Sequence, residues 1–137
     1  DLDKFKPVND EFGHAVGDQL LQELASRLQA CIRDSDTVAR IGGDEFIILL
    51  DGADNQTGIT QIAQRMVDTL QRPVIYRGQQ LNCGASIGIG CFPQDGEDIT
   101  SLIAAADQAM YVAKQSGRNQ LRFASALADS SQVRSDP

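Results

Sequence analysis

The sequence predicts an α/β fold in which helices flank a mixed, mainly antiparallel sheet. Three observations lead to this fold class: apolar residues recur at helical spacing in three segments, short apolar runs lie between those segments, and glycine-containing turns join neighbouring runs. The expected order is helix, strand, strand, helix, hairpin, helix and strand, which is typical of an α/β sandwich.

The three helices follow from apolar residues that lie three and four positions apart. They are expected at Gly17–Ile32, at Ile59–Leu70 before Pro73, and at Ile99–Ser116, with Gly117 as a C-terminal cap. Their apolar faces are Leu20, Leu21, Leu24, Leu28, Cys31 and Ile32; Ile59, Ile62, Ala63, Met66, Val67 and Leu70; and Leu102, Ile103, Ala106, Met110 and Ala113.

The strands are expected in two hairpins and one final run. The first hairpin joins Thr37–Ile41 to Phe46–Leu50. The second joins Val74–Tyr76 to the longer arm Leu81–Gly90, whose glycines indicate bulges or close packing against a helix. Gln120–Phe123 is the last strand.

Composition excludes several classes of protein. With 12 Lys and Arg against 19 Asp and Glu, the net charge is −7, so a long nucleic acid would be repelled. No apolar run approaches the roughly 20 residues that span a bilayer, so no membrane contact is expected. Cys31, Cys83 and Cys91 lack metal-site or redox spacing and are expected to be buried thiols in a reducing cytoplasm.

One domain, residues 1–124, is expected, followed by a flexible tail or linker at 125–137 that is rich in Ser, Ala and Asp. The chain begins with Asp1 rather than Met, and its first apolar helix begins only near Leu20. We therefore expect a fragment that opens in mid-domain.

The first hairpin turn, Gly42-Gly43-Asp44-Glu45, carries two adjacent acids that repel each other. Glycine can take the positive φ of a tight turn and lets a ligand approach the backbone. A hard divalent cation would neutralise the acids, because Mg²⁺ takes one or two carboxylates and leaves other positions to water and phosphate oxygens. A plain acidic turn is the alternative.

A second acidic group, Asp1-Leu2-Asp3, opens the chain. In a strand, Asp1 and Asp3 would share one face, and the Leu2 carbonyl would remain an oxygen ligand. If this end lies beside the hairpin, Asp1 and Asp44 form a two-carboxylate cation site. The alternative is a solvated strand end.

Seven ordered segments resemble the diguanylate cyclase, or GGDEF, domain over residues 1 to about 124. The resemblance implies a palm-like nucleotidyl-cyclase sandwich whose first helix and first strand are missing from this chain. The segments are Asp1-Leu2-Asp3-Lys4-Phe5-Lys6; Val8-Asn9-Asp10; Phe12-Gly13-His14; Gly17-Asp18; Arg40-Ile41-Gly42-Gly43-Asp44-Glu45-Phe46; Ala85-Ser86-Ile87-Gly88; and Ala113-Lys114-Gln115-Ser116-Gly117-Arg118-Asn119.

The resemblance implies condensation of two GTP into cyclic di-GMP on Mg²⁺, with Mn²⁺ as a second candidate. Asp1, the Leu2 carbonyl and Asp44 would hold the metal, and Glu45 would join the metal shell and assist deprotonation of the attacking 3′-hydroxyl. Asp44 and Glu45 are thus the expected catalytic residues. Because each domain would supply one GTP, a homodimer is implied.

The resemblance also assigns the substrate contacts. The expected set is Asn9 and Asp18 on the guanine edge, Gly42 and Gly43 at the turn, and the backbone N–H groups of Phe5 and Lys6 with the side chains of Lys114 and Arg118 on the triphosphate. The two cations independently suit phosphates, because they flank a helix end in an otherwise acidic chain.

Arg33 and Asp36 form an RxxD segment upstream of the turn. Arg binds phosphate or guanine in a bidentate manner, and a carboxylate accepts guanine N–H groups. The resemblance marks the segment as an inhibitory product site with Arg65 as a third contact. The alternative is a helix-terminal Arg followed by a turn Asp.

His14, the single histidine, lacks a nearby nucleophile and is expected to be structural. Phe5, Phe12 and Phe46 are expected in the core. Besides the enzyme, two hypotheses about function stay open. One is a non-catalytic sensor of cyclic di-GMP or GTP that regulates an attached domain, and the other is an interaction domain. The presence of both Asp44 and Glu45 favours the enzyme.

Overall fold

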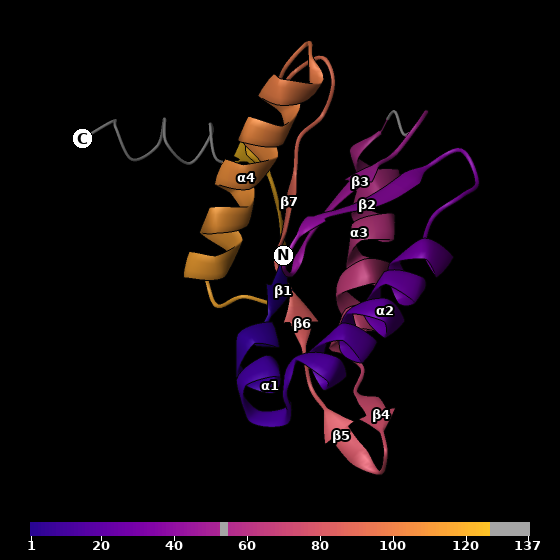
Figure 1. Cartoon of the computed structure of the whole chain (residues 1–137). Coiled ribbons are helices and arrows are strands. Elements are labelled where there is room, and N and C mark those ends of the chain that lie inside the picture. The colour runs from indigo at the N-terminus through magenta and orange to yellow at the C-terminus, as the bar shows by residue number, and fades with distance from the viewer. Residues whose placement is uncertain (53–54, 127–137) are drawn as a thin grey trace. The chain divides into compact units, whose positions relative to one another are not determined.

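Figure 1 shows the computed structural model, which describes residues 1–52 and 55–126. The chain divides into two units, Asp1–Ala85 and Ser86–Pro137, and each is described by itself. The predicted tail at 125–137 lies outside the described residues except for 125 and 126. Within the described part, no helix is both long and apolar enough to cross a membrane.

Helices α2 (His14–Ala30) and α3 (Gln56–Gln71) pack against each other and supply most of the core of the first unit. Both were predicted; α2 begins three residues before the expected Gly17. The Asn55 side chain caps α3 by accepting the Gly58 N–H at 2.7 Å. The buried apolar residues of the pair are Leu20, Leu21, Leu24, Leu28, Ala63, Met66, Val67 and Leu70.

The Arg27 side chain ties α2 to the end of α3. Its guanidinium donates to the carbonyls of Thr69, Arg72 and Pro73 at 3.1, 2.6 and 3.1 Å. Thr69 carries one of the last carbonyls of α3, and Arg72 and Pro73 follow directly after the helix, so one fork-shaped side chain binds the helix end and the segment that leaves it. The chain therefore leaves α3 in a fixed direction toward β4 (Val74–Tyr76).

Helix α1 (Phe5–Phe12) was not predicted. Pro7 lies in its first turn, where a missing N–H costs no helical bond, and Val8 is its buried residue. The expectation that Phe5 and Phe12 lie in the core is wrong, because both are half-buried. Among the described helices, α1 packs mainly on α2, so much of its surface stays open.

Three antiparallel strand pairs belong to the first unit. Strands β2 (Thr37–Gly42) and β3 (Glu45–Leu49) form the predicted hairpin, in which Arg40 lies opposite Phe46 and Gly42 opposite Glu45. Phe46 is half-buried, against the core position expected for it, because this two-stranded ladder is only partly covered.

The predicted single arm Leu81–Gly90 is wrong, because the chain changes partner within it. β5 (Gln79–Leu81) pairs with β4, whereas β6 (Gly84–Ala85) pairs with β1 (Leu2–Asp3). Two residues, Asn82 and Cys83, separate β5 from β6. The break brings the middle of the sequence against its first residues.

The second unit contains β7 (Ile87–Ile89), α4 (Ile99–Gln115) and β8 (Leu121–Phe123), and β7 pairs with β8 in parallel. A Cβ atom at Gly88 would overlap backbone atoms of α4 at Ala106 and Met110. The predicted close packing of a strand glycine on a helix is therefore confirmed for Gly88.

Candidate functional site

The turn between β2 and β3 is built from glycine. Gly42 and Gly43 have φ of 154° and 50°, and the Arg40 Nε donates to the Gly43 carbonyl at 3.0 Å. A Cβ at either glycine would meet nothing within 4 Å, so the turn presents an open backbone. Glycine at position 43 is required by its positive φ rather than by crowding.

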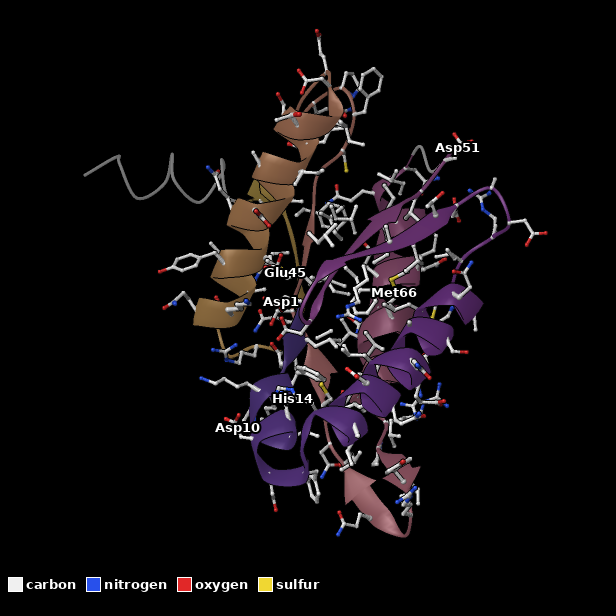
Figure 2. The ribbon with its side chains drawn as sticks, viewed as in Figure 1. Asp1, Asp10, His14, Glu45, Asp51 and Met66 are labelled. Atoms are coloured by element: carbon white, nitrogen blue, oxygen red, sulfur yellow. The ribbon has the colours of Figure 1, made fainter. Side chains whose placement is uncertain are left out.

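The start of the chain lies against this turn. The Leu2 N–H donates to the Asp44 carbonyl at 3.1 Å, so the two acidic segments meet at one corner of the first unit. Figure 2 shows Asp1 and Glu45 in this region. Asp1, Asp44 and Glu45 are all partly exposed residues, although the Oδ1 atom of Asp1 is itself buried. We call these three residues and Leu2 the acidic corner.

The pKa of the Cys83 thiol is affected by carboxylates at and beside the acidic corner. Its buried Sγ donates to the Asp3 carbonyl at 2.8 Å. Burial, with the negative charges of Asp3 and Asp44 adding to its effect, raises the pKa of the thiol to about 11. Since the folded pKa lies above the ordinary 9.0, the thiol is neutral at pH 7, and its contribution to stability falls as pH rises from 9 toward 11.

Nothing in the sequence pointed to Cys83 as a neighbour of Asp44. Its place follows from the pairing of β6 with β1. The expected burial of the cysteines holds for Cys31 and Cys83, whereas Cys91 is half-buried, and all three are free thiols.

The acidic corner offers oxygen donors only: three carboxylates and the Leu2 carbonyl. Hard oxygen donors fit Mg²⁺, which needs one or two protein carboxylates beside water and phosphate oxygens. Over residues 1–52 and 55–126, no three or more His, Cys, Asp or Glu side chains lie close enough together to hold a metal ion. The corner therefore fits an ion shared with a substrate better than a closed protein cage.

Helix α1 begins two residues after Asp3. Lys4 precedes it with φ 63°, and no side chain caps its first turn. The backbone N–H groups of Phe5 and Lys6 thus lie at the positive end of a helix, an arrangement that favours anions.

Asn9 and Asp18 come from the two helices that meet at Gly13. The Asn9 Nδ2 lies 3.0 Å from the His14 Nδ1, and Asp18 is exposed one turn further along α2. Sequence reasoning missed this contact of His14. The only signal for this contact in the sequence was that Asn9 and His14 are five residues apart with Gly13 between them.

Lys114 and Arg118 belong to the second unit. Lys114 lies in the last turn of α4, and the Arg118 N–H donates to the Ala113 carbonyl at 3.0 Å. Gly117, with φ 116°, ends the helix as predicted.

Arg33 and Asp36 meet at the end of α2. The buried Asp36 carboxylate accepts the N–H groups of Arg33 at 3.0 Å and Asp51 at 2.9 Å, and its Oδ2 lies 3.5 Å from the Arg33 Nε. The backbone N–H groups of Arg33 and Asp51 lower the pKa of Asp36, and the Arg33 guanidinium adds to this shift. Asp36 therefore holds the turn, while the Arg33 side chain is 61% exposed.

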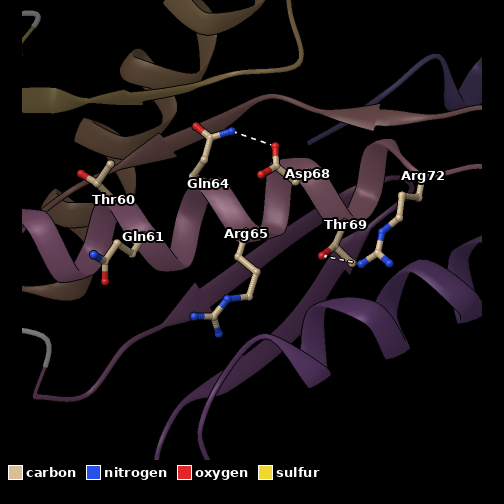
Figure 3. Close-up of a pocket in the computed structure, with 7 residues that line it drawn as sticks. All are labelled: Thr60, Gln61, Gln64, Arg65, Asp68, Thr69 and Arg72. Atoms are coloured by element: carbon tan, nitrogen blue, oxygen red, sulfur yellow. Dashed lines mark hydrogen bonds between the residues drawn. The ribbon is translucent and has the colours of Figure 1, made fainter.

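Arg65 lies on the exposed face of α3. It lines a shallow depression of about 800 Å³ in which Gln64 bonds to Asp68 and Arg72 to Thr69, as Figure 3 shows. In this close-up the Arg65 guanidinium points away from those pairs. Its predicted role beside Arg33 stays a prediction.

Comparison with known proteins identifies the family. The family described as the diguanylate cyclase GGDEF domain matches residues 1–120. The chain belongs to this family.

A curated relative is the bifunctional diguanylate cyclase/cyclic di-GMP phosphodiesterase MucR of Pseudomonas aeruginosa, which is 44% identical over 123 residues. The match covers 90% of this chain but 18% of MucR, so the chain spans under a fifth of that relative.

Solved structures agree on the fold. The GGDEF domain of TpbB (YfiN) from Pseudomonas aeruginosa is 37% identical with a TM-score of 0.85, over 90% of this chain and 77% of that chain. The GGDEF domain of DgcB from Caulobacter crescentus, solved in complex with cyclic di-GMP, is 26% identical with a TM-score of 0.75, over 91% and 74% of the two chains. The predicted fold class is therefore confirmed.

Proposed function

We propose that this domain is a diguanylate cyclase that condenses two GTP into cyclic di-GMP and two pyrophosphates. The observation that supports it most is the hydrogen bond from the Leu2 N–H to the Asp44 carbonyl, because it joins the two acidic segments. Membership of the GGDEF family and the presence of both acids in the Gly42–Glu45 turn add to this support. GTP as substrate places the reaction in the cytoplasm.

In this proposal Asp1, Asp44 and the Leu2 carbonyl hold Mg²⁺ or Mn²⁺, with Glu45 beside them. The ion, when bound, neutralises charge on the α-phosphate and the leaving pyrophosphate. Glu45 takes the proton of the 3′-hydroxyl of one GTP. The 3′-oxygen then forms a bond to the α-phosphorus of the other GTP, the bond from that phosphorus to the bridging oxygen breaks, and pyrophosphate leaves. The same step with the roles of the two nucleotides exchanged closes the ring and releases the second pyrophosphate.

The remaining residues bind and orient the substrate. Asn9 and Asp18 take the guanine, and Gly42 and Gly43 let the nucleotide approach the open turn. We assign phosphate binding to the Phe5 and Lys6 N–H groups of the first unit and to the Lys114 and Arg118 side chains of the second, as the family resemblance implies. Holding the 3′-oxygen in line with the α-phosphorus supplies much of the acceleration in such reactions.

Each GTP is bound by one domain, so the reaction needs two copies that face each other. We therefore expect the specific rate of product formation to rise with protein concentration until the dimer is populated.

The direct test is incubation of the protein with GTP and Mg²⁺, followed by chromatography and mass spectrometry. We expect cyclic di-GMP, pyrophosphate in twofold molar amount over it, no product with ATP, and none after EDTA. Metal-dependent GTP binding without product would instead favour the sensor. Absence of any metal-dependent uptake of GTP would contradict both.

Product inhibition is the finer part of the proposal. We assign the inhibitory site to Arg33, Asp36 and Arg65, because Arg33 is exposed while Asp36 fixes the turn that carries it. Arg33→Ala is expected to weaken cyclic di-GMP binding at least tenfold, since a charged hydrogen-bond donor is lost. Isothermal titration measures this.

Arg77→Ala is the matched control, because Arg77 is another exposed arginine of the first unit, in the turn between β4 and β5, and it does not line the depression that Arg65 lines. Unchanged cyclic di-GMP affinity in Arg33→Ala would contradict the assignment.

A further inference from the structure

The side-chain amide of Asn9 contacts the imidazole of His14. An amide nitrogen only donates, so the His14 Nδ1, 3.0 Å from the Asn9 Nδ2, accepts this hydrogen bond. For the Nδ1 to accept, the neutral imidazole must carry its proton on Nε2. This contact decides which end of the amide faces the histidine and which end is left for another partner.

The joint between α1 and α2 holds this contact in place. Gly13, with φ 93°, donates its N–H to the Asn9 carbonyl at 2.9 Å and accepts the Gly17 N–H at 3.0 Å. A Cβ at Gly17 would overlap the Asn9 Oδ1 and lie 3.2 Å from its Cγ. The Oδ1 therefore lies over Gly17, the residue that directly precedes the exposed Asp18 in the sequence.

We propose that His14 is a positioning residue that orients the Asn9 Oδ1. In this orientation the Oδ1 and the nearby Asp18 carboxylate act as two hydrogen-bond acceptors for the base. The inference rests on the proposed function, and it assigns the selectivity of that site for guanine. Guanine presents neighbouring N–H donors at N1 and N2, whereas adenine presents an acceptor at N1. Two fixed acceptors therefore favour guanine, and an amide free to rotate by 180° loses this distinction.

The test compares His14→Ala, which removes the acceptor, with His14→Asn, whose side-chain oxygen restores one near the position of Nδ1. Fluorescent GTP and ATP analogues give the two affinities, and circular dichroism checks the fold. We expect His14→Ala to lower the GTP-over-ATP preference about tenfold, the effect of one hydrogen bond, and His14→Asn to stay within about threefold of the unchanged protein.

A double-mutant cycle shows whether His14 acts through Asn9. In an Asn9→Ala background, His14→Ala is expected to change the preference no further, whereas additive losses would overturn the inference. An unchanged preference in His14→Ala alone would also overturn it. Should that variant not fold, ¹⁵N NMR of the unchanged protein reads the tautomer, and a proton on Nδ1 overturns the proposal.

The outcomes separate the inference from the proposed function. If the unchanged protein prefers GTP but makes no cyclic di-GMP, the proposed cyclase activity is contradicted, and the His14 variants still test the inference through the binding preference. Protein that makes cyclic di-GMP while His14→Ala keeps its preference contradicts the inference alone. An unchanged protein with no preference for GTP over ATP contradicts both.

Discussion

Asp44→Asn and Glu45→Gln are each expected to lower the rate of cyclic di-GMP formation by about a hundredfold or more. Each replaces a carboxylate by a neutral amide of the same shape, which removes a charged ligand of the ion or the acceptor of the 3′-hydroxyl proton. Losses of one such electrostatic group typically reach 10²–10³. Initial rates at saturating GTP and Mg²⁺ measure the effect.

Loss of structure would not explain this result for Asp44→Asn. The contact that joins the acidic corner runs to the backbone carbonyl of Asp44, and the substitution leaves this carbonyl in place. The melting temperature is therefore expected to stay close to that of the unchanged protein. Asp68→Asn, the same change on the exposed face of α3, is the control and should alter the rate less than twofold. Activity that survives at the level of this control would refute the site.

Gly88→Ala is expected to destabilise the second unit by about 3 kcal/mol or more, which corresponds to a melting temperature roughly 10 °C lower. The added Cβ would overlap backbone atoms at Ala106 and Met110 of α4. Backbone atoms of a packed helix cannot move aside as the end of a side chain does, so β7 and α4 must separate. Thermal unfolding followed by circular dichroism measures the loss.

Gly58→Ala provides the comparison for this prediction. Its Cβ would lie 3.2 Å from the Asn55 Oδ1, the end of a side chain, within helix α3. Alanine also favours helix over glycine by about 1 kcal/mol. The two effects oppose each other, so the melting temperature should change by only a few degrees. Equal melting of the Gly88 and Gly58 variants would show that β7 does not pack on α4 as described.

The parts of the fold that were predictable are those set by local pattern. The apolar spacing of α2, α3 and α4 and the turn at Gly42-Gly43 depend on neighbours in sequence, and the structure confirms them. The division of Leu81–Gly90 was not predictable, because β5 pairs with the neighbouring β4, whereas β6 and β7 pair with the distant strands β1 and β8. Periodicity does not carry the identity of such partners.

The candidate site divides in the same way. Residue types and spacing drew attention to Asp1, Asp44 and Glu45, and the family resemblance supplied the roles expected of them. Their convergence needed the backbone bond from Leu2 to Asp44, and the roles of His14 and Cys83 needed contacts that cross helices and strands. Asp36 is a contrasting case. Its sequence context predicted contact with a ligand, yet both of its carboxylate oxygens accept hydrogen bonds from backbone N–H groups.

The hydrogen bond from the Asp51 N–H to the Asp36 carboxylate anchors the chain just after β3. Asp51 lies two residues beyond β3, and Glu45 begins that strand. β3 has five residues and extends over about 17 Å, so the Arg33 turn and the Gly42–Glu45 turn are attached to opposite ends of one strand. Loss of the Asp36 carboxylate would therefore release the far end of the same strand that begins at Glu45.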